Sequence, residues 1–261
     1  MTEKNIRQHL GEPCPALEYF DVIDSTNTHL KIRAAEGAPH KSIAVADAQT
    51  AGRGRMGRSF QSPGGKGLYL SVLLRPKVPA EFLMRATGMA AVAAARAIGT
   101  VSGAQVAIKW TNDLVLNGRK LCGILSETVM TGNEIALIIG IGINVRQNRE
   151  DFSEDVAALA TSLEMEGFSA DRSRLAAALI EELYHLDRAL GGDIGDYLAE
   201  YRRRCVTLGK DVRLLWTEGQ ERAFAEDIDG AFGLVVRHGN GETSVVKTGE
   251  VSVRGLYGYI E

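Results

Sequence analysis

The sequence has few cysteines, no long apolar run and no excess of either charge. Its three cysteines, Cys14, Cys122 and Cys205, form no Cys-x-x-Cys pair among the 261 residues. We therefore expect reduced thiols, as in a cytoplasmic protein, and no cysteine-held metal. No stretch approaches the roughly 18 apolar residues of a membrane span, and residues 1–16 lack the apolar core of a signal peptide. Secretion by a signal peptide and membrane insertion are not expected.

The balance of charge argues against a polyanionic partner. Thirty basic side chains face 33 acidic ones, a formal net charge of −3. A nucleic-acid or membrane-surface role therefore has no support in the bulk composition, and any basic site must be local. A hydrophobic content of 45% is enough for one large core, or for a large domain with a small one.

Residues 17–145 mix short apolar runs with helical patches, which predicts an α+β fold. Asp24-Ser25-Thr26-Asn27 supplies N-cap chemistry for a helix that ends near Gly37, and Gly99 fits the C-cap of a second helix. Asn117-Gly118 is typical of a type I′ hairpin turn, and residues 131–133 predict another. Expected helices span 24–36, 82–98, 171–189 and 194–204, and expected strands span 42–48, 67–74, 106–110, 114–116, 120–129 and 135–145.

After Cys205 the pattern changes to short β-rich runs separated by Gly and Asn turns. Such runs predict a small β-barrel over residues 208–261, separate from a larger domain over residues 1–207. A unit of this size has little core of its own, so it should dock on the larger domain. The expected runs span 212–216, 222–228, 234–237, 244–247 and 251–254.

The most informative segment is the loop over residues 49–67, with six glycines, four cations and no acid. Glycine lets backbone N–H groups turn toward an anion and arginine adds paired donors, so the loop suits a phosphate or carboxylate. A mobile, solvated loop is the alternative. Gly52, Gly54 and Gly57 match a dinucleotide fingerprint, but Pro63 and further glycines follow where a helix should begin. The P-loop pattern also fails, since Gly67 follows Lys66.

Three further segments combine polar and small residues. Residues 109–113 (Lys-Trp-Thr-Asn-Asp) and 119–125 (Arg-Lys-Leu-Cys-Gly-Ile-Leu) could hold and polarise a charged substrate, or form a surface hairpin with solvated charges. Residues 140–144 (Gly-Ile-Gly-Ile-Asn) place glycines in an apolar strand. This pattern indicates close approach of a ligand or of backbone, or else a bulge.

Together with residues 24–27, these motifs resemble those of biotin protein ligases in order and spacing. The resemblance covers about residues 17–145, and the C-terminal segment is more loosely similar. It implies a mixed sheet with flanking helices, as in class II aminoacyl-tRNA synthetases, followed by a Src-homology-3-like barrel. It also implies that biotin and ATP, with Mg²⁺, give biotinyl-5′-adenylate and pyrophosphate. A lysine of a biotin carboxyl carrier protein then takes the biotinyl group.

The resemblance also implies roles for individual residues. Those that would line the biotin ureido pocket are Ser25, Thr26, Asn27 and Gln49. Those that would hold biotin and its activated carboxyl are Arg53, Gly54, Arg55 and Lys120. Those that would serve the nucleotide are Arg58, Phe60, Lys109, Asn112 and Asn144. This chain departs from the family pattern at three positions. Many relatives have Pro where Thr111 stands and Trp near the position of Phe60, and the position of Met56 is commonly basic.

Elementary chemistry supports catalytic roles for three residues. A carboxylate that attacks the α-phosphorus of ATP brings anions together, so fixed cations such as Lys120 and Arg55 lower the barrier. The carrier lysine must attack as a neutral amine, and Asp113 is the candidate base. An ion pair between Asp113 and a neighbouring lysine is the alternative. No residue is assigned as a metal ligand.

Rival functions follow from the same residues. A lipoate ligase or another acyl-adenylate transferase would need an apolar tunnel, whereas Ser25, Thr26 and Gln49 favour biotin. A non-catalytic phosphate- or nucleic-acid-binding module would use the basic loop alone. Only 23 residues precede Asp24, too few for the helix-turn-helix domain of repressor relatives, so no DNA binding is expected. The sequence leaves the oligomeric state open and is compatible with a homodimer.

Overall fold

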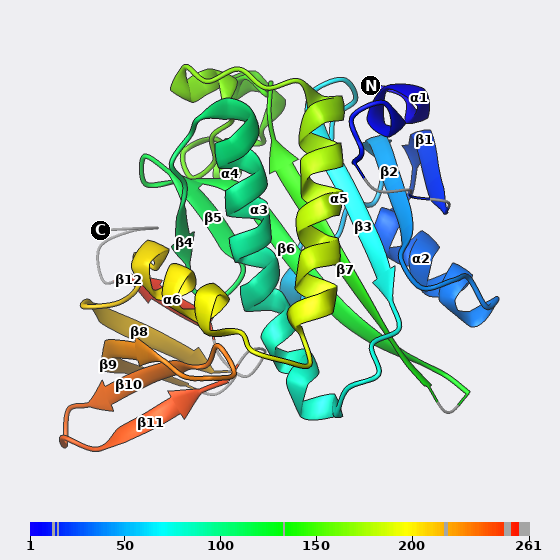
Figure 1. The fold of residues 1–261 in the computed structure, drawn as a ribbon. Helices are drawn as coiled ribbons and strands as arrows, with labels where there is room; N and C mark the ends of the chain where they lie inside the picture. Colours follow the sequence, from blue (N-terminus) through cyan, green and yellow to red (C-terminus); the bar gives the residue numbers. More distant parts are fainter. Residues whose placement is uncertain (12–13, 15, 133, 217–218, 248–251, 256–261) are drawn as a thin grey trace.

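A mixed seven-stranded sheet and a smaller antiparallel sheet form the molecule (Figure 1). The computed structural model describes residues 1–11, 14, 16–132, 134–216, 219–247 and 252–255. The helices are α1 (Glu3–Arg7), α2 (Thr26–Ala35), α3 (Ala86–Ser102), α4 (Glu154–Ala157), α5 (Arg172–Ala189) and α6 (Gly195–Arg204). The strands of the large sheet are β1 (Leu17–Ile23), β2 (Ser42–Gln49), β3 (Gly67–Leu74), β4 (Ala107–Lys109), β5 (Asp113–Leu116), β6 (Arg119–Thr131) and β7 (Glu134–Asn144). Those of the small sheet are β8 (Asp211–Trp216), β9 (Gly219–Ile228), β10 (Leu234–His238), β11 (Thr243–Val246) and β12 (Ser252–Gly255).

The large sheet has the strand order β1-β2-β3-β7-β6-β5-β4. The pair β1 and β2 is parallel and every other pair is antiparallel. The small sheet has the order β11-β10-β9-β8-β12 and is antiparallel throughout. The expected mixed sheet with helices and a C-terminal β unit is confirmed. A domain boundary at residue 207 stays a prediction.

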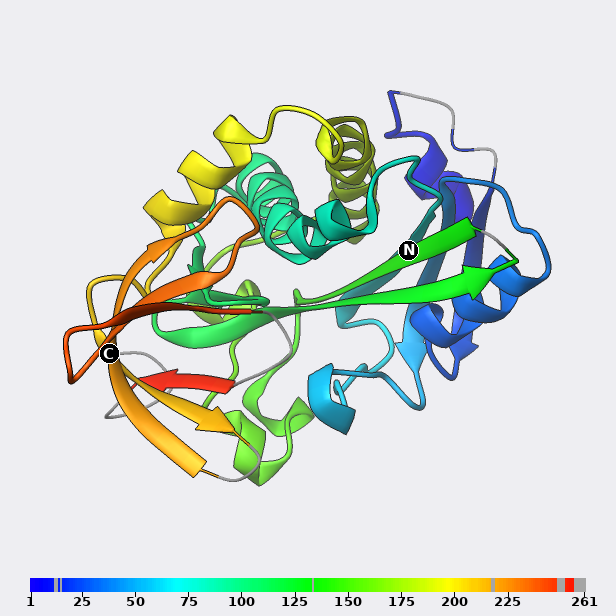
Figure 2. The same ribbon diagram turned by 90° about the horizontal axis from the view of Figure 1, so that it is seen from below.

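Both faces of the large sheet are covered, because its strands alternate between two hydrophobic clusters. On β7, Ile139 and Ile141 belong to the main core, whereas Ala136 and Ile138 belong to a smaller cluster with Leu30 of α2. Helices α3 and α5 lie side by side over the main-core face (Figure 1). Helix α2 and the loop that follows β2 lie on the other face (Figure 2).

Local signals explain most helix ends. The Ser25 side chain accepts a hydrogen bond from the Thr28 backbone N–H at 3.4 Å and so caps α2, as expected. The expected C-cap at Gly99 is wrong. Helix α3 continues to Ser102, and Gly103, with a φ of 76°, ends it. A second glycine four residues later therefore provides the left-handed residue, while Gly99 stays helical.

Several elements have no strong signal in the sequence. Residues 80–85 form a 3₁₀ turn rather than the start of α3. Strand β1 was not expected, because it is an edge strand with mostly half-buried or exposed side chains and lacks a clear apolar alternation. Helices α1 and α4 have only five and four residues, too short for a helical period to show. The second residue of the expected turn 131–133, Gly132, has a φ of 64°, whereas Asn133 lies outside the described residues.

The expected docking of the small sheet on the larger part is confirmed. The Trp110 indole N–H donates to the Phe232 carbonyl at 2.9 Å. The Phe232 ring meets that of Tyr201 edge to face, with 5.2 Å between the ring centroids. Phe232 also fills the space above Gly88 of α3, where a Cβ would lie 2.2 Å from a ring carbon. The turn between β9 and β10 thus anchors the small sheet.

The contact at Gly88 yields a stability prediction. We expect Gly88→Ala to lower the free energy of unfolding by about 1–3 kcal/mol, because the new methyl group overlaps the Phe232 ring. Gly99→Ala is the matched control in the same helix, since its Cβ would meet only the Ala104 carbonyl oxygen, at 3.7 Å. That variant should gain up to ~1 kcal/mol from helix propensity. Urea unfolding measures the free energy of unfolding of both variants, and equal values for the two would contradict the prediction.

Candidate active site

A cavity of about 660 Å³ opens on the face of the large sheet opposite α3 and α5. Its walls come from the start of α2, the loop after β2, and the strands β5, β6 and β7. All the residues that the sequence analysis assigned to a site line it. They are Ser25, Thr26, Asn27, Gln49, Arg53, Gly54, Arg55, Arg58, Phe60, Lys109, Asn112, Asp113, Lys120 and Asn144.

The basic loop folds back on itself as a short hairpin. The Gly54 N–H donates to the Arg58 carbonyl at 2.7 Å, and the Phe60 N–H donates to the Gly52 carbonyl at 2.8 Å. Met56 and Gly57 form the tip, with φ values of 55° and 73°. No helix of regular length begins here, in agreement with the expectation against a dinucleotide-binding loop. The hairpin holds its arginines against the cavity.

Uncharged polar groups form part of the cavity wall. The Gln49 amide oxygen accepts from the Thr26 N–H at 2.9 Å and from the Thr26 hydroxyl at 3.2 Å, while its NH₂ donates to Ser62 at 3.0 Å. The Ser25 hydroxyl oxygen caps α2, which leaves its proton able to donate elsewhere. These groups hold one another in place beside the positive end of the α2 dipole.

Charged groups form another part of the wall. The Lys120 ammonium lies 2.6 Å from a carboxylate oxygen of Asp113. The Arg55 guanidinium donates to the Asn112 side-chain oxygen at 3.0 Å, and the Asn112 NH₂ donates to the Ile124 carbonyl at 2.9 Å. Burial lowers the pKa of Arg55, although the Asp113 charge opposes this shift. In the structure Asp113 therefore forms the ion pair that the sequence analysis held as the alternative to a base.

The glycines of β7 make room for side chains rather than for backbone. A Cβ at Gly140 would lie 2.0 Å from the Asn27 side-chain oxygen, and one at Gly142 would lie 2.5 Å from the Phe60 ring. Pairing of β7 with β3 and β6 continues through both glycines without a shift in register. The bulge alternative is wrong, and the close approach comes from Asn27 and Phe60.

Two of the residues expected to contact a ligand, Asn27 and Asn144, form side-chain hydrogen bonds within the protein. The Asn27 oxygen accepts from the Ser71 hydroxyl at 2.6 Å, and its NH₂ donates to the Leu125 carbonyl at 3.2 Å. The Asn144 NH₂ donates to the Thr161 carbonyl at 2.9 Å, and its oxygen accepts from Gln147 at 3.1 Å. Both amides thus shape the cavity wall.

Known proteins resemble this chain over the segments that build the cavity. The model of the Biotin/lipoate A/B protein ligase family matches residues 19–144. A biotin–[acetyl-CoA-carboxylase] ligase of Mycobacterium tuberculosis is 33% identical over 260 residues, which cover 96% of this chain and 95% of the relative. The chain belongs to the biotin protein ligase family.

Other members of the biotin protein ligase family extend the comparison. The bifunctional ligase/repressor BirA of Bacillus spizizenii is 43% identical over 159 residues, which cover 60% of this chain but 49% of that protein. The chain therefore spans about half the length of this relative. The structure of the biotin protein ligase from Aquifex aeolicus in complex with biotin and ATP has a TM-score of 0.77 and 26% identity, and it covers 92% of this chain and 99% of that one.

Sequence reasoning missed several residues of the cavity. Tyr69, Phe152, Asp155 and Leu159 also line it, as does Arg213 of β8 in the small sheet. Arg213 follows Lys120 by some ninety residues and stands in an ordinary strand pattern, so the sequence offers no signal for it. Tyr69 stands in the apolar strand β3, whose residues are all buried, so the sequence marks it only as a core residue.

The described part of the chain contains neither a membrane-spanning helix nor a cluster of metal-binding side chains. None of its helices combines the length and apolar character that a membrane crossing requires. It brings together no group of three His, Cys, Asp or Glu side chains that could hold a metal. All three cysteines are buried and unpaired with one another, and their reduced state stays a prediction. Asp113 and Asp155 are the acidic side chains of the described cavity lining.

The close approach of Asn27 to β7 gives a stability prediction. We expect Gly140→Ala to lower the free energy of unfolding by about 1–3 kcal/mol, because its methyl group displaces the Asn27 amide. In an Asn27→Ala background the same change should cost much less, since the displaced group is gone. A double-mutant cycle by urea unfolding measures this coupling, and additive effects would refute the steric account.

Proposed function

We propose that this chain attaches biotin to a lysine of a biotin carboxyl carrier protein at the expense of ATP. The cavity carries the proposal, because one volume is lined both by the neutral polar groups of Ser25, Thr26 and Gln49 and by cations such as Arg55 and Lys120. Its size lies in the range of small-molecule sites, roughly 300–1,000 Å³. The relative from Aquifex aeolicus was solved in complex with biotin and ATP. The buried free thiols are consistent with a cytoplasmic setting.

In the first half-reaction the biotin carboxylate attacks the α-phosphorus of ATP. A C–O–P bond forms, the bond to the β-phosphate breaks, and pyrophosphate leaves. Ser25, Thr26 and Gln49 suit the ureido group, because neutral donors and acceptors match its own. Arg55 and Lys120 would face the reacting oxygens, where a fixed cation stabilises the charge that concentrates in the transition state. Burial of Arg55 strengthens its field there.

In the second half-reaction the carrier lysine attacks the biotinyl carbonyl, an amide forms and AMP leaves. The amine must lose a proton, and Asp113 is our candidate to accept it. Its ion pair with Lys120 supports a coupled role. Once the adenylate phosphate binds Lys120, the Asp113 carboxylate loses part of that interaction and can accept a hydrogen bond from the incoming amine.

Mg²⁺ fits this cavity as a partner of the ATP phosphates. When bound, the ion would neutralise phosphate charge and assist the departure of pyrophosphate. Asp113 and Asp155 offer carboxylate oxygens in the lining, and Mg²⁺ commonly takes only one or two carboxylates besides phosphate oxygens and water. A dedicated all-protein metal cage finds no support in the described residues.

Lipoate ligation and non-catalytic phosphate binding are the competing functions. Lipoate has an apolar ring and would leave the Ser25 hydroxyl proton and the second N–H of the Gln49 amide without a ligand partner, so these polar groups favour biotin. A binding module would not need Lys120 and Arg55 in the same cavity. Isotope exchange between pyrophosphate and ATP separates the three, because only a biotin ligase requires biotin for the exchange.

Removing the Lys120 ammonium should abolish most of this exchange. We expect Lys120→Ala to reduce kcat by a factor of about 10²–10³, since one preorganised electrostatic donor contributes roughly 2.7–4 kcal/mol. Lys66→Ala is the matched control, because Lys66 pairs with Asp151 at 3.2 Å and is not part of the cavity lining. It should keep near-normal exchange. Near-normal kcat in Lys120→Ala would remove Lys120 from the mechanism.

Asp113→Asn separates the half-reactions, because it keeps the shape of the side chain and removes the proposed base. Supplied biotinyl-5′-AMP should bind well but transfer slowly to a carrier domain. Raising the pH should restore part of the rate, as more of the carrier lysine becomes neutral. Single-turnover transfer across a pH series is the measurement. If transfer and thermal stability fall together without recovery at high pH, Asp113 has a structural role instead.

A further inference from the structure

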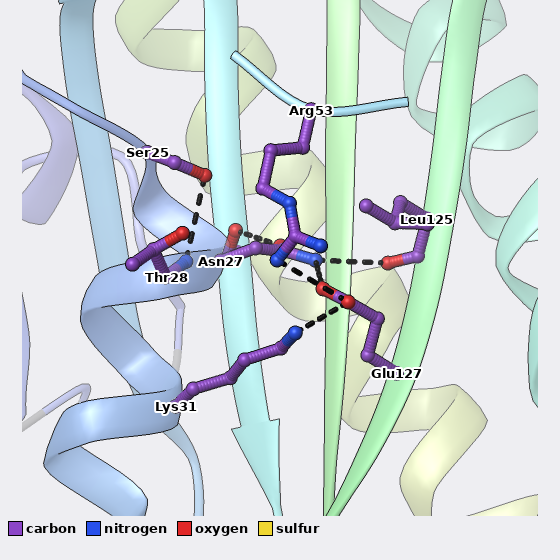
Figure 3. A network of polar contacts seen from close by, with 8 residues as sticks. Ser25, Asn27, Thr28, Lys31, Arg53, Leu125 and Glu127 are labelled. Atoms are coloured by element: carbon purple, nitrogen blue, oxygen red, sulfur yellow. Dashed lines mark hydrogen bonds and ion pairs between the residues drawn. The ribbon is translucent and has the colours of Figure 1, made fainter. Parts of the chain in front are cut away.

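Glu127 of β6 connects this strand to α2 and to the loop that follows β2 (Figure 3). Its Oε2 accepts from the Asn27 NH₂ at 3.0 Å, and its Oε1 lies 3.4 Å from the Arg53 guanidinium. The Lys31 ammonium of α2 also contacts Oε1. Glu127 does not line the cavity, whereas Asn27 and Arg53 do. Any effect on a ligand must therefore pass through these two neighbours.

The Glu127 carboxylate is held in its charged form. Its side chain is only 18% exposed, and a buried carboxylate is costly unless charges and hydrogen bonds compensate it. Burial alone would raise the pKa of Glu127, but hydrogen bonds from Lys31 and Asn27, with the Arg53 charge, outweigh it and lower the pKa. The carboxylate is thus a fixed anion to which the loop arginine is drawn.

The number of charges in this cluster matters as much as their position. Glu127 alone would neutralise Arg53 and weaken its attraction for an anionic substrate. Lys31 supplies a second cation to the same oxygen, so the three groups together carry a net charge of +1. Lys31 is itself not part of the cavity lining. The arrangement therefore fixes the direction of Arg53 while leaving positive charge for a ligand.

We propose that Glu127 and Lys31 are positioning residues, in which Glu127 fixes Arg53 and Asn27 at the cavity wall and Lys31 preserves the attraction of Arg53 for the biotin carboxylate. The choice of substrate rests on the proposed function. The geometric part does not, because it concerns the hairpin at residues 52–60 in the absence of any ligand.

Limited trypsin digestion without ligand tests the geometric part. Trypsin cleaves after arginine, and Arg53 stands at the base of the hairpin. Glu127→Gln keeps an acceptor for Asn27 but removes the charge, so cleavage within residues 53–58 should become about fivefold faster, as the loss of one partly exposed ion pair allows. Lys31→Met should not speed cleavage, because Glu127 then pairs with Arg53 alone. Glu18→Gln, which loses ion pairs to α2 away from the cavity, is the control and should behave as wild type.

Biotin-dependent pyrophosphate exchange tests the second part. Both Glu127→Gln and Lys31→Met should raise the KM for biotin about fivefold with a smaller change in kcat, and Glu18→Gln should change neither. Wild-type cleavage in Glu127→Gln would overturn the positioning role, and an unchanged KM in Lys31→Met would overturn the charge role. If wild type shows no biotin-dependent exchange, the proposed function is wrong, and the digestion still decides on Glu127. If Glu127→Gln does not fold, Lys31→Met still decides the charge role through the KM, and Glu127→Asp, whose shorter side chain draws the carboxylate away from Arg53, decides the positioning role through the same digestion: it should also be cleaved faster, and wild-type cleavage would overturn that role.

Discussion

The absence of side chains at two positions of β7 is the constraint on which the cavity depends. Gly140 and Gly142 stand in the middle of the large sheet, flanked by buried isoleucines. Asn27 and Phe60 lie directly on the strand at these points. The first turn of α2 and the base of the basic hairpin can therefore approach the sheet closely. A larger residue at either glycine would push these walls away and open the cavity.

Charge is the second constraint, because the proposed reaction joins two anions. The cavity lining places six cations against the two carboxylates Asp113 and Asp155; the cations are Arg53, Arg55, Arg58, Lys109, Lys120 and Arg213. A wall with this excess of positive charge would repel itself unless it were held by neutral partners or by shared acids. Asn112 holds Arg55, while Asp113 and Glu127 hold Lys120 and Arg53. Each acid orients a cation and leaves a net positive field for the substrate.

The sequence predicts the site better than it predicts the frame around it. Residues such as Arg55 and Lys120 stand in motifs with unusual chemistry, so their convergence could be foreseen. Gly99 shows the limit for local signals, because a helix end depends on which of two nearby glycines adopts a left-handed conformation. Arg213 shows the limit for distant contacts, since nothing in β8 reveals which surface it will face. Glu127 could have been predicted, because it lies two and four residues after Leu125 and Gly123 and therefore shares their face of β6.

One contact of the small sheet reaches the cavity wall at Trp110, which lies between Lys109 and Asn112. The Trp110 backbone N–H donates to the Thr207 hydroxyl at 3.0 Å, and its indole donates to the Phe232 carbonyl. The Tyr201 hydroxyl donates to the Thr111 carbonyl at 3.1 Å. These bonds fix the residues that lie between Lys109 and Asn112 in the cavity wall. Displacement of the small sheet would therefore shift these two side chains together, so docking and substrate positioning depend on the same contacts.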